Sequence, residues 1–146
     1  MRIELLNAVE ADLKAAFPKK EIIKSWSLYH LLKDIAAKAD NSPIIVSLAR
    51  EGGEEVPQSQ GSLTTKIGID IHVLSALERP KMVEAAGLLS EEVRAYFRFR
   101  QIEQCPHAIW IGTKDRMAYD PETIREYGIY ASVFTVNYRI YEEAET

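Results

Sequence analysis

The sequence predicts an α+β fold with a single antiparallel or mixed β-sheet of about four to five strands and two to three helices packed on one face. The first observation is residues 63–77, where aliphatic and polar side chains alternate over a long stretch. Successive side chains of a strand point to opposite faces, so this stretch predicts a main strand with one row in the core and one row outside. Residues 129–141 alternate in the same way and predict a second long strand.

The two rows of the first strand differ sharply in chemistry. The row predicted to face the core is Leu63, Ile67, Ile69, Ile71 and Val73, and the row predicted to face outward is Thr64, Lys66, Gly68, Asp70 and His72.

The remaining elements follow from spacing and from chain breakers. Apolar residues at helical spacing predict a helix over residues 3–17, which Pro18 ends because the residue before a proline avoids helical backbone angles. A short edge strand is expected at 21–26, a second helix at 28–39, and a strand at 43–49 that begins at a proline.

Residues 50–62 are expected to form a loop. They contain two adjacent glycines and a proline, and they have little apolar surface to bury. This segment joins two predicted strands, which indicates a hairpin with a long loop that projects from the sheet. Loops of this length are commonly either mobile or ordered by a partner.

The second half of the chain predicts two helices and a strand before the closing strand. Residues 81–89 are expected to form a short helix interrupted at Gly87, and Ser90 is expected to cap the next helix, which runs to residue 104. Arginines alternate with apolar residues near the end of that segment, which also fits a strand, but a helix is favoured. A short buried strand is expected at 107–113.

Length and composition limit the class of protein. A chain of 146 residues is a normal single domain, here taken as residues 1–146. The net charge of −4 argues against a general nucleic-acid binder, which needs a basic surface. No apolar run approaches the roughly 20 residues of a membrane span. Acidic residues interrupt the apolar ones at the N-terminus, which is not typical of a signal peptide, so synthesis in the cytosol is expected.

Known signatures of catalysis and cofactor binding are missing from the sequence. Gly52 and Gly53 are followed by two glutamates, which would repel a phosphate group. There is no GxSxG nucleophile motif, and the three histidines have no metal-ligand spacing to one another. The single Cys105 excludes an internal disulfide and is expected to be a small buried residue. We therefore expect no enzyme activity, no cofactor and no metal.

One pair of residues keeps a second function open. Asp70 and His72 lie two positions apart and therefore share one strand face. A carboxylate and an imidazole in this arrangement can act as an acid–base pair. The alternative function is thus a small-ligand-binding protein or enzyme that uses this polar strand face. The competing interpretation is an ordinary solvated or interfacial face.

Charge and tyrosine content point towards self-assembly. A basic arginine segment and an acidic loop and tail carry opposite charges, and a head-to-tail contact between identical subunits would bring them together in a ring. Charge segregation is also common in monomers, and many of the tyrosines can equally fill the second face of the sheet. The residues expected at the interface are Glu51, Glu54, Glu55, Gln58, Gln60, Arg94, Arg98, Arg100, Tyr130 and Tyr138.

The whole-chain layout resembles a family of phage proteins. The features that carry this resemblance are the opening helix LLNAVEADLKAAFP, the strand SPIIVSLAR, the loop EGGEEVPQSQGS, the strand KIGIDIHVLSAL and the closing strand YGIYASVFTVNYRIYEE. Together they resemble the small tail-terminator or tail-completion proteins of long-tailed phages and prophages, such as lambda-like minor tail protein U and the Mu-like prophage tail proteins.

The resemblance implies a structural subunit without chemistry of its own. It implies a homo-oligomeric ring, expected to be a hexamer, that caps the tail tube, stops its growth and forms the head-joining surface. The implied partners are further copies of the chain, the tail tube protein and the head–tail connector proteins, with no membrane and no specific nucleic-acid binding. The implied location is the host bacterial cytoplasm during assembly and then the virion tail. A bacterial adaptor or immunity-type protein with the same layout is a third interpretation.

Overall fold

The structure, a computed structural model, describes residues 2–25, 44–49, 54–59, 61–76, 80–116 and 129–143. The predicted helix at 28–39 lies outside these residues. The helices and strands, in chain order, are α1 (Arg2–Ala16), β1 (Glu21–Ser25), β2 (Ile44–Ala49), β3 (Glu54–Ser59), β4 (Ser62–Ala76), α3 (Pro80–Phe97), β5 (Ala108–Arg116) and β6 (Ile129–Glu143).

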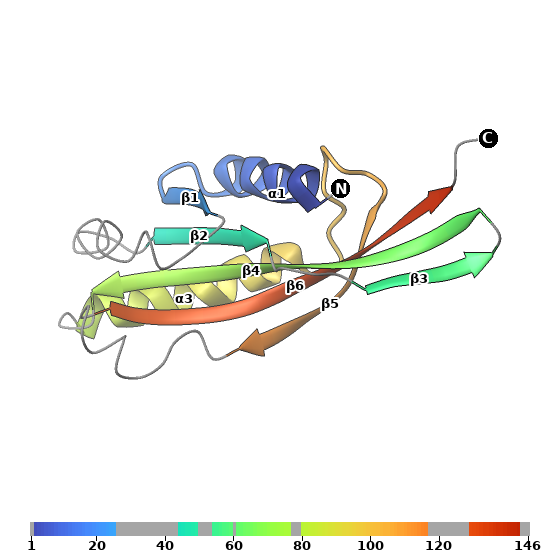
Figure 1. The fold of residues 1–146 in the computed structure, drawn as a ribbon. Helices are drawn as coiled ribbons and strands as arrows, with labels where there is room; N and C mark the ends of the chain where they lie inside the picture. Colours follow the sequence, from blue (N-terminus) through green and yellow to red (C-terminus); the bar gives the residue numbers. More distant parts are fainter. Residues whose placement is uncertain are drawn as a thin grey trace.

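The strands form one mixed sheet, as predicted. Five strands follow one another in the order β1-β2-β4-β6-β5, and β3 pairs with the part of β4 that β2 leaves uncovered. The β1–β2 pair is parallel and the other pairs are antiparallel. The predicted edge strand β1 and the antiparallel pairing of β2 with β4 are both confirmed. The α+β fold class is therefore confirmed (Figure 1).

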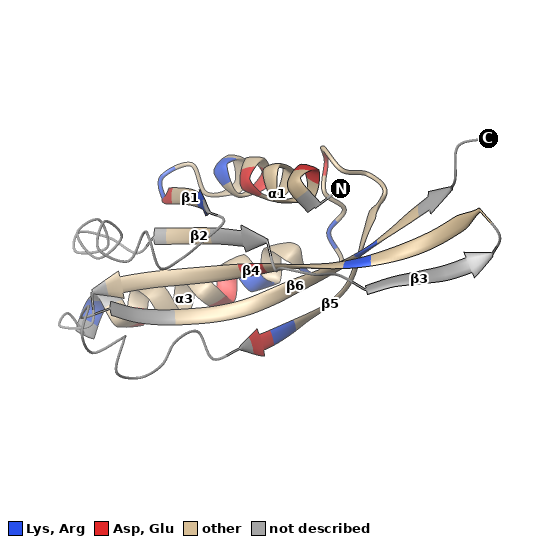
Figure 2. Cartoon of the chain, viewed as in Figure 1, with Lys and Arg blue, Asp and Glu red and all other residues tan. Residues whose placement is uncertain are grey.

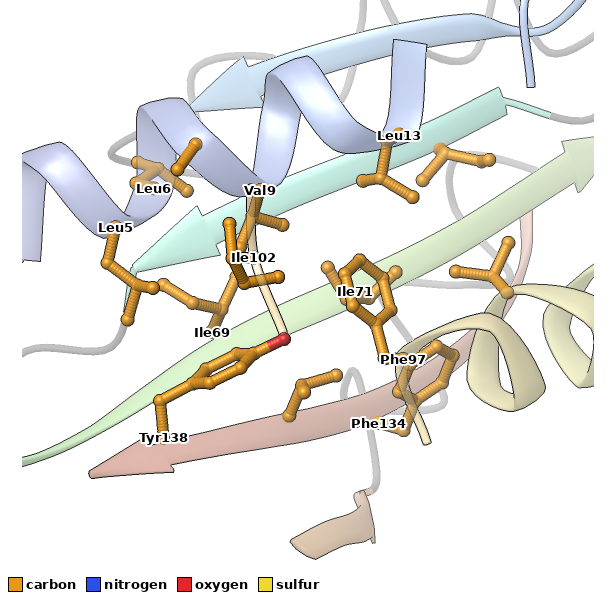
Figure 3. Packing of buried hydrophobic residues seen from close by; sticks show 14 of the residues in the cluster. Leu5, Leu6, Val9, Leu13, Ile69, Ile71, Phe97, Ile102, Phe134 and Tyr138 are labelled. Carbon is orange, nitrogen blue, oxygen red and sulfur yellow. The ribbon is translucent and has the colours of Figure 1, made fainter. Parts of the chain in front are cut away.

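The core lies between one face of the sheet and the two helices α1 and α3. The predicted row of β4 is fully buried at Ile67, Ile69, Ile71 and Val73. Their neighbours on β6 include Phe134 and Val136, and both helices contribute the apolar face that their spacing predicts. Figure 3 shows these side chains meeting, among them Leu5, Leu6, Val9 and Leu13 of α1, Phe97 of α3 and Ile102 after it.

The prediction of a loop at residues 50–62 is wrong for the central part of this segment. Residues 54–59 form β3, which pairs antiparallel with β4 from Glu54–Lys66 to Ser59–Ser62. A two-residue connection joins the strands, and its Gly61 has a φ of 84°, which glycine adopts without a steric penalty. Pro57 is tolerated because β3 is an edge strand. The composition of this segment is typical of a loop. Its backbone nevertheless pairs with β4, because β4 extends beyond the end of β2 and leaves that part of its edge available.

The strands β3, β4 and β6 together extend past the helices as a projecting arm (Figure 1). We define the arm as residues 54–59, 62–66 and 139–143. Figure 2 shows basic segments on β4 and β6 at the base of the arm, where the register pairs Lys66 with Arg139. The predicted projection of this region from the sheet is thus formed by strands and not by a loop.

The helix α3 also differs from its prediction. It is continuous through Gly87, and Ser90 lies inside it, where its Oγ is 2.9 Å from the Oγ of Ser132 on β6. Ala86 and Leu89 pack against the core on both sides of the expected break, so burial keeps the helix intact despite the glycine. The choice of helix over strand is confirmed, but the helix ends at Phe97 and not at residue 104.

Part of the predicted outward row of β4 is buried. Lys66 is exposed as expected, but Thr64 and His72 are buried, and His72 is only 4% exposed. In the register His72 lies between Val46 of β2 and Val133 of β6, which are buried as well. The polar side chain of His72 is therefore not solvated, because its neighbours on both adjoining strands are apolar and buried.

Tyr138, predicted to lie at an interface, is instead part of the core. It pairs with Ile67 in the register and is 0% exposed, because both residues face the helices. Figure 3 shows its ring lying among aliphatic side chains, with the hydroxyl oxygen directed into the core. Within the described part of the chain this hydroxyl has no hydrogen-bond partner, and burial raises its pKa.

Removing that hydroxyl is expected to stabilise the protein. Tyr138→Phe should raise the free energy of unfolding by about 1 kcal/mol, because an unsatisfied polar group leaves the core while the ring stays in place. Urea unfolding followed by circular dichroism measures the change. The control is Tyr96→Phe, which removes a hydroxyl that donates to the carbonyl oxygen of Asp12 at 3.4 Å and should not stabilise. A loss of stability in Tyr138→Phe would contradict this account.

Candidate functional site

A cavity of about 350 Å³ opens beside the start of β5. We call it the socket. Its walls come from the segment that follows α3, residues 98–107, and from the first residues of β5. The lining residues are Phe99, Arg100, Gln101, Pro106, Ala108, Ile109 and Trp110. The socket thus lies at the edge of the described sheet that β5 forms, with Trp110 on the helix-covered face and Ile109 on the opposite face.

Phe99 is the most exposed large apolar residue of the socket. Its side chain is 83% exposed and its φ is 59°, the left-handed region that bulky residues rarely adopt. Such a conformation costs on the order of 1–2 kcal/mol in a residue with a Cβ. The turn that ends α3 imposes it, because the backbone amides of Arg98 and Arg100 donate to the carbonyls of Ala95 and Phe97. A strained backbone therefore displays an aromatic ring to solvent.

Trp110 forms the facing aromatic wall. Its ring meets that of Phe99 edge-on, with centroids 5.0 Å apart and an interplanar angle of 66°. The indole Nε1 donates to the Oγ1 of Thr113 at 3.1 Å, which holds the ring in this orientation. The half-buried indole and the exposed phenyl ring together make an apolar surface that the described residues leave partly exposed.

The strand β5 adds further exposed apolar groups. The prediction of a strand at 107–113 is confirmed, but its predicted burial is wrong at Ile109 and Ile111, which are both exposed. The reason is that β5 is the outermost strand of the described sheet and carries a bulge between Trp110 and Gly112. Gly112 has a φ of 145°, a backbone conformation that favours glycine. The bulge leaves Ile111 unpaired and turned towards solvent.

Arg100 anchors the socket to α1. Its Nε lies 3.3 Å from the Oδ2 of the buried Asp12, and its guanidinium stacks 4.0 Å from the ring centroid of Tyr96. The pKa of Tyr96 is raised, first by burial and then by the nearby Asp12 charge. Arg100 was predicted to serve an interface between copies; within its own chain it forms a clamp between the socket segment and α1.

The other predicted interface residues lie in two separate places. Arg98 is exposed beside the socket, and Arg94 forms an ion pair with Asp115 of β5. Glu54, Glu55 and Gln58 lie on β3 in the arm, and only their backbone is described. The structure does not bring the acidic and basic groups together within one chain, since β4 and β6 separate β3 from β5.

Three further predicted residues also have no described side chain. Glu51 and Gln60 lie outside the described residues, and Tyr130 has its backbone in β6 opposite Ser75. Sequence reasoning missed Phe99, Ile109 and Trp110 as site residues. The available signal for Phe99 is the alternation of aromatic residues with arginines before residue 100, a pattern that also fits a strand.

Asp70 and His72 share one face, as their spacing requires, but they differ in environment. The Oδ1 of Asp70 accepts a hydrogen bond of 2.5 Å from the Oγ1 of Thr135. Burial lowers the pKa of His72 to about 4, against the opposing effect of the Asp70 charge. His72 is therefore neutral at pH 7. Cys105 is buried as expected, and burial raises the pKa of its thiol.

In the described ranges, no three His, Cys, Asp or Glu side chains are grouped so that they would hold a metal ion. None of the described helices has the length and hydrophobicity needed to span a bilayer. No protein-family model matches the sequence, and no curated protein is significantly similar to it.

Proposed function

We propose that this protein is a structural subunit of a phage or prophage tail, which assembles with copies of itself into a ring that caps the tail tube. In this role the ring stops tube growth and forms the surface that joins the head. The proposal rests on the resemblance in chain layout together with one feature of the structure, the exposed aromatic socket at the β5 edge.

The socket supports assembly because several exposed apolar side chains lie near one another there. Phe99, Ile109 and Ile111 are all exposed and lie close to the half-buried Trp110. Clusters of exposed apolar side chains are a recurring feature of interaction sites in proteins. The edge strand next to it adds backbone groups that a neighbouring subunit can pair with. A structural subunit that must bind identical neighbours requires such a surface.

The alternative function, a ligand site at Asp70 and His72, receives less support. The imidazole is 4% exposed, and Asp70 already accepts a hydrogen bond from Thr135. A small molecule would therefore have to displace neighbouring groups to reach His72. Asp70→Ala and His72→Ala distinguish the two functions: a ligand-dependent rise in melting temperature that disappears in either variant would favour the alternative.

The direct test is to measure the assembly and its effect on tail tubes. Light scattering across a concentration series, with negative-stain microscopy of the large species, is expected to show a closed ring with a central hole. The purified protein is then added to tail tube protein while the tubes polymerise, and the tubes are expected to become shorter with increasing protein. A protein that stays monomeric and leaves tube length unchanged would contradict the proposal.

A further inference from the structure

We propose that the outer face of β4, β6 and β5 binds the exposed face of α3 in a second copy of the chain. The sheet surface, which we call the basic face, consists of three rows across these strands: Lys66, Arg139 and Ile109; Gly68, Asn137 and Gly112; and Asp70, Thr135 and Lys114. The helix surface, which we call the acidic helix face, consists of Glu84, Gly87, Leu88, Glu91 and Glu92. The inference rests on the proposed function only in that it requires this chain to associate with copies of itself.

The first row of the basic face carries two cations and an aliphatic side chain. Lys66 of β4 and Ile109 of β5 both pair with Arg139 of β6, so the three side chains lie side by side. All three are exposed, Ile109 to 55%. Ile67 and Tyr138, which alternate with them along β4 and β6, are buried in the core that α1 and α3 cover. The first row is therefore turned away from both helices.

The middle row is low because two of its three residues are glycines. Gly68 and Gly112 flank Asn137 in the register. Apart from its chain neighbours, a Cβ added at Gly112 would meet no atom within 4 Å, so the space beside this position is open. Glycine inside a strand often marks a place where another backbone comes close. A helix can therefore lie nearer to the sheet here than side chains on all three strands would allow.

The third row places a further cation beyond the glycines. Lys114 of β5 is exposed and pairs with Thr135, which lies four positions from Arg139 and hence on the same side of the sheet. Asp70 lies on the other side of Thr135 and accepts its hydrogen bond. Four positions of a strand span about 13 Å, which is the separation of Lys114 and Arg139 along the sheet. The edge of the basic face next to β5 is therefore positively charged at both ends.

The exposed face of α3 carries the opposite charge. Leu88 is 57% exposed, and the exposed Glu84, Glu91 and Glu92 lie three or four positions from it, so they surround it on the helix surface. A described cation of this helix, Lys81, lies seven positions before Leu88, at the start of α3. The surroundings of the exposed leucine are thus acidic.

The two surfaces match in spacing. Glu84 and Glu92 are eight positions apart on α3, which is about 12 Å at 1.5 Å per residue and close to the separation of Arg139 and Lys114. A helix lying along β5 and β6 would place one carboxylate near each cation and Leu88 over the glycine row. An apolar centre with a charged rim is the usual anatomy of a protein interface.

The contact requires two copies, because the two surfaces lie on opposite sides of one chain. Val93 and Phe97 pack α3 onto the inner face of the sheet, and the acidic helix face is exposed. Two basic faces, or two acidic helix faces, would repel each other, which selects a head-to-tail contact. Such a contact produces a closed ring when the rotation between subunits closes. Ile109 also lines the socket, so the docked helix would cover part of the socket wall.

Reversing the charge of each surface tests the contact. Lys114→Glu/Arg139→Glu makes the basic face acidic, and Glu84→Lys/Glu92→Lys makes the acidic helix face basic. Each variant alone presents two surfaces of like charge, so its dissociation constant for assembly should rise at least about tenfold. An equimolar mixture should assemble again in alternating order, because each altered surface then meets a complementary one. Light scattering of the separate and mixed variants measures this, after circular dichroism has shown that both are folded.

The control and the contrary outcomes are as specific. Lys19→Glu/Lys20→Glu reverses two charges in the turn after α1 and should assemble as the wild type does. Equal assembly of the wild type and both charge-reversed variants would overturn the inference, and so would a mixture that assembles no better than its components. Nucleic acid is the other acidic partner to examine. A single-stranded oligonucleotide whose binding is lost in Lys114→Glu/Arg139→Glu, with assembly unchanged, would assign the basic face to nucleic acid instead.

The apolar centre is tested by Leu88→Ala. This change should raise the dissociation constant at least about fivefold, as expected when a leucine at the centre of an interface is truncated. Ile3→Ala is the matched control, since Ile3 is 59% exposed on α1 and should have no effect. Equal effects of the two changes would count against the contact.

Association and tube length are measured separately, so that this inference and the proposed function can fail independently. If the wild type associates and the charge-reversed mixture regains assembly, but tail tubes are not shortened, the proposed function is wrong and the contact stands. If the wild type forms rings that shorten tubes, and charge reversal changes neither property, the contact is wrong and the proposed function stands.

Discussion

Replacing Arg100 by alanine is expected to lower the free energy of unfolding by about 2–3 kcal/mol. The Nε of Arg100 pairs at 3.3 Å with the Oδ2 of Asp12, which is buried in α1. Removing one partner of a buried ion pair leaves an uncompensated charge, which costs about 3–5 kcal/mol for fully buried pairs. The Arg100 side chain is 42% exposed, so water compensates part of this cost. The stacking of the guanidinium on Tyr96 is lost as well.

Urea unfolding of three variants measures this effect and its cause. Arg100→Lys keeps the charge but not the stacking geometry, so it should fall between the wild type and Arg100→Ala. Adding Asp12→Asn to Arg100→Ala should recover part of the loss, because it removes the orphaned charge. Arg94→Ala is the matched control: its pair with Asp115 is exposed, and less than about 1 kcal/mol is expected. Equal losses in Arg94→Ala and Arg100→Ala would contradict the importance of burial.

Acidification is expected to destabilise the protein through His72. Burial lowers the pKa of this imidazole from 6.5 to about 4 in the folded state. Below pH 6.5 the unfolded chain therefore binds a proton that the folded chain does not bind, and stability falls as the pH drops from 6.5 towards 4. A difference of this size corresponds to about 3 kcal/mol, at 1.36 kcal/mol for each pKa unit. Below pH 4 both states are protonated and the loss is complete.

The contribution of His72 is isolated by comparison with a variant that does not titrate. The free energy of unfolding of wild type and of His72→Gln is measured at pH values from 7 to 4.5. The difference between the two proteins should shift in favour of the variant as the pH falls. His107→Asn, which removes an exposed histidine, should follow the wild type. A constant difference between wild type and His72→Gln across this range would show that His72 is not buried as a neutral imidazole.

The sequence pattern alone was sufficient to predict the elements that have one continuous apolar row. The strands at residues 63–77 and 129–141 and the helix at 3–17 all have one apolar row, and burial of that row decides their structure whatever the neighbours are. The same reasoning placed Ile67, Ile69 and Ile71 in the core and predicted the antiparallel pairing of β2 with β4, although β3 lies between them in the chain.

Local patterns failed where a partner far along the chain decides the outcome. Residues 54–59 look like a loop, but they form β3 because β4 offers an unpaired edge. Gly87 and Ser90 look like a helix boundary, but packing of the flanking residues on the sheet continues the helix. His72 looks solvated, but the valines beside it on β2 and β6 are enclosed. Each error arose because the composition of a segment does not show which other parts of the chain pair with it or pack against it.

The sequence by itself determined the α+β class, the two long strands, the buried row of β4 and the opposite charges on different segments. Only the tertiary structure decided where those charges lie, that Tyr138 is in the core, and that Phe99 and Trp110 meet beside β5, the outermost strand of the described sheet. The physical reason is that periodicity specifies which face of an element is apolar, whereas a binding surface depends on which faces stay uncovered after packing. The socket joins residues from the end of a helix and from an edge strand, and no spacing in the sequence encodes that meeting.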